Sequence, residues 1–370
     1  MTMHKLGKKQ AECGVPLAWD IHDEAGQLLL RRGYVINNPK QLATLMERGL
    51  FINATDSSTT VATLLDRSYD PFWLWDDIIV KLGQLLRHHD RDADFPIQLD
   101  VLAQMAQLLV NRSRDAALAA MILLTDQRRY SLVHCLHAAI LSDLVALRLG
   151  WDEERRRSVV CAALTMNIST VDTQQVLTDQ AGPLTPEQHM AIKAHPTTSA
   201  EMLRGVGVND VIWLQAVQDH HETPLGSGYP KGHKEIGEEA TLLRTTDVFS
   251  AKVSPRTHRK PMSGPQAARV LFTDPGMATE NPFIAVLIKE IGIYPPGSYV
   301  KLANGETGIV FKRTDNAHTP VVLSLTNSKG TPESKPIRRD TSREEHKILA
   351  VIPRDDIRLR LDPTSLWANS

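Results

Sequence analysis

The stretch at residues 220–230, which reads HHETPLGSGYP, constrains the fold more than any other part of this 370-residue chain. Gly226, Gly228 and Pro230 predict a loop, because glycine reaches backbone angles that other residues avoid and proline lacks a backbone donor. The apolar segment before it, residues 211–219, has helical character. We therefore expect two adjacent histidines at the end of a helix, covered by a loop. Neutral imidazole is the commonest protein ligand for transition metals, so the pair marks a candidate metal site, although an exposed turn would be the simpler interpretation of His-His alone.

Composition narrows the class of protein. Hydrophobic residues make up 42% and charged residues 23%, which is ordinary for a soluble globular protein, and the length predicts two or three structural units. The formal net charge of -1 gives no reason to expect nucleic acid or an anionic membrane as partner. Three widely spaced cysteines, Cys13, Cys135 and Cys161, fit a reducing compartment and supply no zinc or disulfide framework. The polar N-terminus lacks a secretory apolar core, and the richest apolar run, residues 116–124, falls short of the ~20 that a spanning helix needs, so we expect a cytoplasmic protein.

The first third of the chain predicts two units. Residues 15–53 alternate around a turn at residues 24–26 and end in a short helix over residues 39–48, which predicts a small ββα module at residues 1–55. Such a module serves docking or sensing, or is structural padding, and padding is the simpler interpretation.

Residues 56–125 are expected to be a linker and a helical stalk. Residues 55–60 are polar, and the apolar residues from Leu99 to Leu109 follow one buried helix face. The aromatic cluster of Phe72, Trp73 and Trp75 is interpreted as core or dimer packing. Residues 115–124 predict a further apolar helix.

Four motifs in the middle of the chain occur together in one known family. They are residues 220–230, then Tyr130–His134 with Leu149-Gly150, His195-Pro196 with Met202-Leu203, and Thr246–Phe249 with Arg256 and Arg259. Over residues 126–293 this order resembles the HD-GYP family, bacterial metal-dependent phosphodiesterases that hydrolyse cyclic di-GMP. The resemblance implies a mainly α fold: an HD-type helical bundle with small N-terminal ββα and C-terminal β units.

The resemblance also implies a ligand set. His134 stands at the first metal ligand, His195 at the ligand of the "HP" helix, His220 and His221 at the paired ligands, and Asp247 at the last carboxylate. By the same resemblance, ligand binding is expected from Gly228, Tyr229, Pro230, Arg256 and Arg259. Lone histidines on helix faces are more often ordinary polar residues, but their joint register favours descent from metal ligands.

One motif departs from the family. Where the family reads AALLHDIGK, residues 162–170 read AALTMNIST, so that Met166-Asn167 replaces the His-Asp doublet. Methionine is a soft, weak ligand, and asparagine has no charge with which to bridge two cations. One site would keep only His134 and Asp247, whereas the site of three histidines could still hold one divalent ion (Fe, Mn or Zn). A dinuclear site and catalytic residues are therefore not expected.

Three further departures point the same way. Leu225 and Ser250 stand where the family has aspartates, and Tyr130 stands where members with three metals carry a glutamate. None of these changes alone abolishes catalysis.

The C-terminal part, residues 294–370, predicts a small β unit. Asn304-Gly305 is the strongest turn signal in the chain and predicts a hairpin, and residues 321–325 and 348–352 predict further strands. Residues 328–345 are polar and contain proline, which predicts a long exposed loop.

Two functions remain open from the sequence. The first is a non-catalytic regulator in cyclic di-GMP signalling, which binds cyclic di-GMP, a related nucleotide or a protein partner such as a diguanylate cyclase. The alternative is an active cyclic di-GMP phosphodiesterase with a mononuclear or rearranged metal site. Neither nucleic acid nor membrane is expected as a partner, and a homodimer is compatible with the helical stalk.

Overall fold

The computed structural model describes residues 3–5, 21–23, 27–31, 34–38, 40–41, 51–53, 70–91, 94–126, 129–180, 182–255, 261–279, 281–359 and 361–367. Several sequence predictions fall outside these residues: the polar linker at 55–60, most of the helix expected at 39–48, and both Arg256 and Arg259. The chain divides into two compact units, one comprising Met1–Tyr69 with Asp76–Lys81 and the other Asp70–Trp75 with Leu82–Ser370.

A small antiparallel sheet lies in the first unit. The predicted hairpin is confirmed, since Ile21 pairs with Leu30 and the amide of Asp23 donates to the carbonyl of Gln27 at 2.9 Å. Two additional strands that the sequence did not predict extend it, giving the order β1-β4-β2-β3. The strands are β1 (Met3–Lys5), β2 (Ile21–His22), β3 (Leu28–Leu30) and β4 (Phe51–Asn53).

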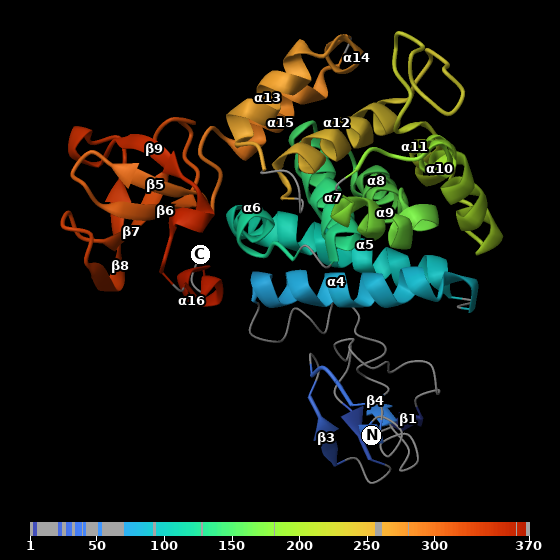
Figure 1. Ribbon diagram of the computed structural model, residues 1–370, viewed down its shortest axis with the longest axis horizontal. Coiled ribbons are helices and arrows are strands. Elements are labelled where there is room, and N and C mark those ends of the chain that lie inside the picture. The colour runs from blue at the N-terminus through green and yellow to red at the C-terminus, as the bar shows by residue number, and fades with distance from the viewer. Residues whose placement is uncertain are drawn as a thin grey trace. The chain divides into compact units, whose positions relative to one another are not determined.

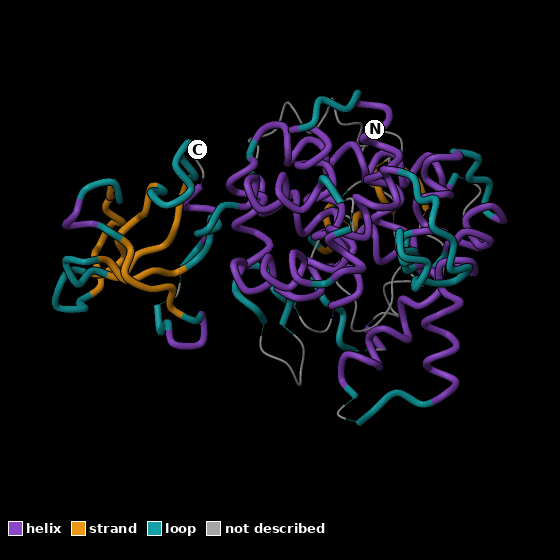
Figure 2. The backbone as a smooth tube through the Cα atoms, turned by 90° about the horizontal axis from the view of Figure 1, so that it is seen from above, coloured by secondary structure: helices purple, strands orange, loops and turns teal. Residues whose placement is uncertain are grey.

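The second unit is mostly helical (Figure 2), and its long helices gather around α7 (Figure 1). Helices α5, α8, α12 and α15 pack directly against α7. The bounds are α4 (Pro71–Arg87), α5 (Phe95–Arg112), α6 (Arg114–Leu123), α7 (Tyr130–Arg148), α8 (Glu153–Thr165), α9 (Val171–Asp179), α10 (Pro186–Gly205), α11 (Val211–Asp219), α12 (Glu238–Val253), α13 (Gly264–Thr273), α14 (Pro275–Ala278), α15 (Phe283–Ile291) and α16 (Pro363–Trp367). Short 3₁₀ turns lie at His89–Arg91, Ile168–Thr170, Glu344–His346 and Arg354–Asp356.

Helix α7 is the core helix of the bundle. By length and composition it could cross a membrane, with a mean hydropathy of 1.5 in its most apolar window. The prediction that residues 116–124 are the richest apolar run is therefore wrong. The most apolar window of α7 is 94% buried inside the protein. A helix that is apolar on every side is one that other helices enclose.

The predicted helical segments before α7 are confirmed. The apolar face expected from Leu99 to Leu109 is buried along α5, and α6 follows it closely. Phe72 and Trp75 of the aromatic cluster are buried, whereas Trp73 is 40% exposed. The apolar spacing therefore placed the buried face of α5 correctly.

Side-chain caps set the start of the two helices that carry the candidate histidines. Thr185 accepts from the amide of Gln188, whose side chain accepts from the amide of Thr185, so α10 begins with a capping box. Asp210 accepts from the amide of Trp213 at 3.0 Å and begins α11. These caps fix where each helix starts and hence which face its histidines occupy.

A five-stranded antiparallel sheet of order β8-β7-β6-β5-β9 forms the C-terminal part of the unit. The predicted hairpin is confirmed, because Lys301 pairs with Thr307 across the Asn304-Gly305 turn. Its core consists of Val300, Leu302, Val310, Val322 and Ile348. The strands are β5 (Tyr299–Leu302), β6 (Thr307–Lys312), β7 (Val321–Thr326), β8 (Pro332–Asp340) and β9 (Ile348–Ile352).

The long loop expected at residues 328–345 is wrong, because strand β8 occupies much of it. β8 lies at the edge of the sheet and pairs only with β7 among the described strands. Most of its residues are exposed, and an edge strand tolerates both proline and charge. The polar composition of this segment therefore led to the wrong prediction of a loop.

Ion pairs and backbone contacts join this sheet to the helices of the same unit. The guanidinium of Arg313 lies 2.6 Å from the carboxylate of Asp115 at the start of α6. Arg354 donates to the carbonyl of Leu123 at the end of α6, at 2.5 Å. Trp367 of α16 packs beside Phe72.

Candidate metal centre

Helix α10 presents His195 through a feature of its own backbone. Pro196 lies inside the helix and has no N–H, so the carbonyl of Ile192 receives no hydrogen bond from the residue four positions later. The imidazole of His195 takes that place, with its Nδ1 2.6 Å from the Ile192 oxygen. Because a carbonyl oxygen can only accept, Nδ1 donates and Nε2 keeps a lone pair. The His-Pro dipeptide thus fixes the tautomer of the ring.

His220 reaches the same state at the end of α11. The helix ends at Asp219, so the carbonyl of Val217 is among the last four that have no helical partner. The Nδ1 atom of His220 lies 2.6 Å from that oxygen and donates to it. The Nε2 atom of His220 therefore also keeps a lone pair.

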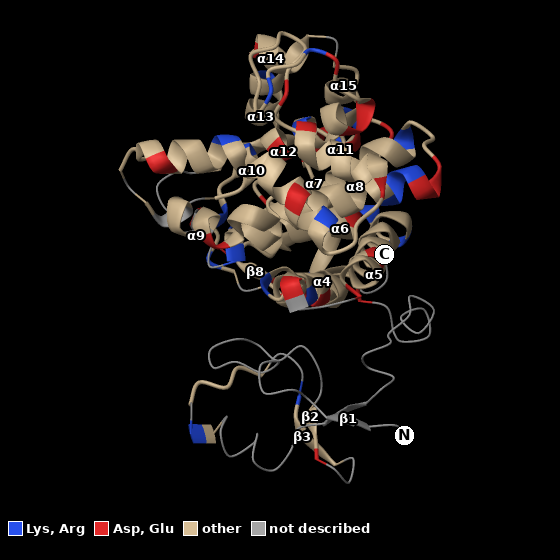
Figure 3. Ribbon diagram, turned by 90° about the vertical axis from the view of Figure 1, so that its right-hand side faces the viewer, with Lys and Arg blue, Asp and Glu red and all other residues tan. Residues whose placement is uncertain are grey.

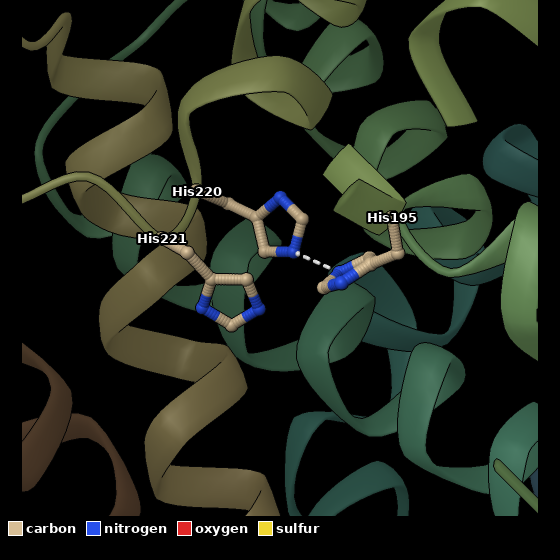
Figure 4. A group of neighbouring side chains, drawn as sticks. All are labelled: His195, His220 and His221. Atoms are coloured by element: carbon tan, nitrogen blue, oxygen red, sulfur yellow. Dashed lines mark hydrogen bonds between the residues drawn. The ribbon is translucent and has the colours of Figure 1, made fainter. Parts of the chain in front are cut away.

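The three imidazoles of His195, His220 and His221 converge (Figure 4). The Nε2 atoms of His195 and His220 are 3.1 Å apart, and one nitrogen from each of the three rings lies within 4.8 Å of the others. Two lone pairs at this distance repel each other unless a cation or a shared proton lies between them. Ligand nitrogens around a tetrahedral zinc ion are roughly 3.3 Å apart, given bonds of about 2.0–2.1 Å. The donor set of this histidine triad therefore fits one divalent metal ion.

Burial keeps the histidine triad neutral. It lowers the pKa of His220 to about 3, with a further lowering from the nearby His195. It also lowers the pKa of His195 and, together with the neighbouring His220, that of His221, although the charge of Asp247 opposes both shifts. Neutral imidazole is the form that binds a metal, so protons do not compete for these nitrogens near neutral pH.

His134 and Asp247 form a separate pair that is closed on itself. The Nε2 atom of His134 lies 2.7 Å from Oδ1 of Asp247, and its Nδ1 atom lies 3.1 Å from the hydroxyl of Ser250. Burial alone would raise the pKa of Asp247, but the hydrogen bond with His134 helps to hold it below its usual value. Asp247 is therefore ionised and already has a partner, and both nitrogens of His134 are occupied.

Met166 and Asn167 lie at the end of α8, inside the bundle. Met166 is fully buried and Asn167 is 3% exposed. Burial raises the pKa of the Cys135 thiol to about 12, and a hydrogen bond with the Asn167 side chain opposes that rise. Because Cys135 follows His134 on α7, Asn167 lies beside the helix of the His134–Asp247 pair and offers it a neutral amide.

The loop after the paired histidines packs back onto them. A Cβ at Gly228 would come within 2.5 Å of the Glu222 backbone, so only glycine fits there. This close approach stacks the Tyr229 ring on that of His221, with 4.6 Å between ring centroids. The buried carboxylate of Glu222 accepts from the amides of Lys231 and Gly232 and holds the loop closed. Pro230 follows in the same loop.

The structure thus brings the candidate residues together in two groups. His195, His220 and His221 form the histidine triad, and His134 with Asp247 forms the pair. Gly228, Tyr229 and Pro230 lie beside the triad, whereas Arg256 and Arg259 are outside the described residues.

Two residues of the site were missed from the sequence. Glu222 belongs to the HHE motif, but its role in holding the loop was not predicted. Arg244 lies one helical turn before Asp247 and donates to the carbonyl of His221 at 3.2 Å. The spacing of three residues on a helix could have placed Arg244 on the face of Asp247.

Comparisons with known proteins agree with this fold. Residues 97–275 match the family described as HD domain. The solved structure titled Bd1817, a HDG"Y"P protein from Bdellovibrio bacteriovorus, covers 77% of this chain and 98% of that chain, with a TM-score of 0.52 and 17% sequence identity. At that identity the likeness concerns the fold, which is an HD-type helical bundle.

Three curated relatives share a shorter region. Cyclic di-GMP phosphodiesterase PA4108 of Pseudomonas aeruginosa is 26% identical over 199 residues, 53% of this chain and 48% of its own length. The 3'3'-cGAMP-specific phosphodiesterase 3 of Vibrio cholerae is 26% identical over 45% of this chain and 36% of its own length. Cyclic di-GMP phosphodiesterase response regulator RpfG of Xanthomonas campestris is 28% identical over 40% of both chains. The chain thus spans less than half the length of each of these relatives. The HD-domain match at residues 97–275, the names of these relatives and the fold of the solved structure agree with the motif order that resembles the HD-GYP family.

Proposed function

We propose that this chain is a non-catalytic regulator in cyclic di-GMP signalling that binds a cyclic dinucleotide at a site with one divalent metal ion. The names of the relatives, phosphodiesterases of cyclic di-GMP and of 3'3'-cGAMP, support the ligand class. The proposed metal ligands are His195, His220 and His221, and the proposed metal is Fe, Mn or Zn. When bound, such an ion supplies a Lewis-acid contact to a phosphate oxygen.

The observation that carries the proposal is the closed pair beside Asn167. Hydrolysis by the family mechanism needs two cations joined by an anionic bridge. Asn167 offers no charge, and the carboxylate of Asp247 is already hydrogen-bonded to His134 at 2.7 Å. With no anion shared between two cations, their mutual repulsion is not screened. Metal content above one ion per chain is therefore not expected.

The remaining residues have proposed roles in recognition. Tyr229 would contact the ligand beside His221. The tight turn at Gly228 holds its ring in place, and Pro230 follows it in the same loop. Arg256 and Arg259 would contact the phosphates of the ligand. Basic and acidic segments are interspersed over the helices (Figure 3), which supports a small ligand or a protein partner rather than nucleic acid or an anionic membrane.

The cellular setting and the protein partners are part of the same proposal. We place the protein in the cytoplasm, with a diguanylate cyclase or a second copy of the chain as candidate protein partners. The division into residues 1–55, 56–125, 126–293 and 294–370 is likewise proposed, with the first module as the docking or sensing unit.

One observation favours a second candidate function. Three imidazoles around an ion leave a coordination position open, as in catalytic zinc sites. The alternative is therefore a phosphodiesterase that works with one metal ion or a rearranged site.

One assay separates the two candidates. Purified protein is incubated with cyclic di-GMP and Mn²⁺ or Fe²⁺, linear product is separated by chromatography, and bound metal is measured per chain. The regulator predicts saturable nucleotide binding without product. Product formation that is lost in His220→Ala and kept in His189→Ala, which changes an exposed histidine of the same α10 helix as His195, would establish the phosphodiesterase instead.

A further inference from the structure

Arg244 lies at the edge of the candidate metal centre. One side of its guanidinium makes no hydrogen bond to the described residues. The Nη1 atom donates to the carbonyl of His221 at 3.2 Å. The Nε atom is buried and has no hydrogen-bond partner among the described residues. Nε and Nη2 form the edge of a guanidinium that binds two oxygens side by side, and that edge has no acceptor from the described part of the chain.

The surrounding acidic groups are engaged elsewhere. The carboxylate of Asp247 pairs with His134, that of Glu222 accepts from loop amides, and that of Asp274 accepts from the amide of Gly276 at 2.9 Å. The charges of Asp247, Asp274 and Glu222 act on the guanidinium, but none of these carboxylates forms an ion pair with it within the described residues.

A glycine, Gly276, lies beside this cation. A Cβ at Gly276 would lie 3.8 Å from Nη2 of Arg244 and 3.3 Å from Oδ1 of Asp274. At 3.8 Å from Nη2 that Cβ would make an ordinary van der Waals contact. The Arg244 residue is only partly buried although its Nε atom is enclosed, so an anion would approach the guanidinium from the side of Nη2.

We propose that Arg244 binds a phosphate group of the ligand, as a fixed positive charge of the protein beside the histidine triad. The inference rests on the proposed binding of a cyclic dinucleotide and assigns the residue that recognises its phosphodiester. Arginine suits this role, since its planar fork matches two phosphate oxygens and it stays charged at all relevant pH values.

The test measures ligand affinity at two salt concentrations for three variants. Arg244→Gln keeps a donor for the His221 carbonyl and removes the charge, Arg244→Lys keeps the charge, and Arg269→Gln changes an exposed arginine of the neighbouring helix α13. Binding of cyclic di-GMP and of inorganic phosphate is measured by calorimetry, alongside metal content and melting temperature.

Arg244→Gln is expected to weaken cyclic di-GMP binding about 10- to 100-fold, the size of a lost charged hydrogen bond, and to flatten its salt dependence. Arg244→Lys should keep the salt dependence, and Arg269→Gln should match the wild type. Metal content and melting temperature should not change. Unchanged affinity in Arg244→Gln, or a loss that accompanies loss of metal, would overturn the inference and leave the proposed function standing.

The two proposals can fail separately. If the wild type binds inorganic phosphate through Arg244 but not cyclic di-GMP, the phosphate site stands and the nucleotide ligand is wrong. If the wild type binds neither probe, both proposals are wrong.

Discussion

The histidine triad and the His134–Asp247 pair are built from the same chemistry and end in opposite states. In the triad, the carbonyls of Ile192 and Val217 accept hydrogen bonds from the Nδ1 atoms of His195 and His220. The Nε2 atoms of these two histidines therefore keep their lone pairs and lie 3.1 Å apart. In the pair, the carboxylate of Asp247 and the hydroxyl of Ser250 occupy both nitrogens of His134. The difference shows that histidines are available to a metal ion only where the protein leaves their lone pairs without partners.

The largest expected effect is the gain of a whole metal site. Restoring the doublet with Met166→His and Asn167→Asp adds an imidazole and an anionic bridge beside the His134–Asp247 pair. Metal content should rise from one ion per chain toward two, as measured by mass spectrometry of the metal. Asn167→Asp alone is the control for the bridge without the new imidazole; no rise in the double variant would show that the pair cannot reopen.

Loss of His134 alone should destabilise the protein more than loss of both His134 and Asp247. His134→Leu leaves the buried charge of Asp247 without a partner and should lower the free energy of unfolding by about 3–5 kcal/mol. His134→Leu combined with Asp247→Leu should recover much of that loss, because no unpaired charge remains. Chemical denaturation measures both, and equal losses in the single and double variants would contradict a buried, ionised Asp247.

The tautomer of the triad can be tested through the backbone. Pro196→Ala returns an N–H to α10 that competes with His195 for the carbonyl of Ile192. Metal affinity should fall about 10- to 100-fold, the usual effect of losing a group that orients a ligand. Pro186→Ala is the matched control, since at the start of α10 a missing N–H costs nothing. Equal metal affinity in both variants would contradict the role assigned to Pro196.

The smallest expected effect is on the pH dependence of stability. It concerns His137, a buried histidine with no proposed metal role. Burial lowers its pKa to about 3, so below about pH 6.5 the unfolded chain takes up a proton that the folded protein does not. Stability from this group is present above that pH and is lost as the pH falls toward 3. His137→Gln should reduce the slope of unfolding free energy against pH by up to about 1.4 kcal/mol per pH unit in this window. An unchanged slope would mean that His137 is protonated in the folded protein.

Local sequence patterns correctly predicted the parts of the fold that are determined by residues close together in the chain. The end of α11 and the hairpin at Asn304-Gly305 are confirmed because an apolar run and a turn signal determine them locally. Strand β8 was missed because its exposed edge position permits proline and charge. Composition alone does not separate such a strand from a loop.

The state of the site depends on contacts that no local pattern contains. His134 and Asp247 are 113 positions apart in the chain, and only the packing of α7 against α12 brings them within 2.7 Å. The same packing determines that Arg244 faces the carbonyl of His221. Motifs could name the candidate ligands, but they could not show which of them already had partners.

The most direct test is the position of bound metal in a crystal of the native chain, located by anomalous scattering after growth with Mn²⁺, Fe²⁺ or Zn²⁺. The account predicts one ion, held by His195, His220 and His221, and none between His134 and Asp247. Two fully occupied ions, with the second bound to His134 and Asp247, would contradict it.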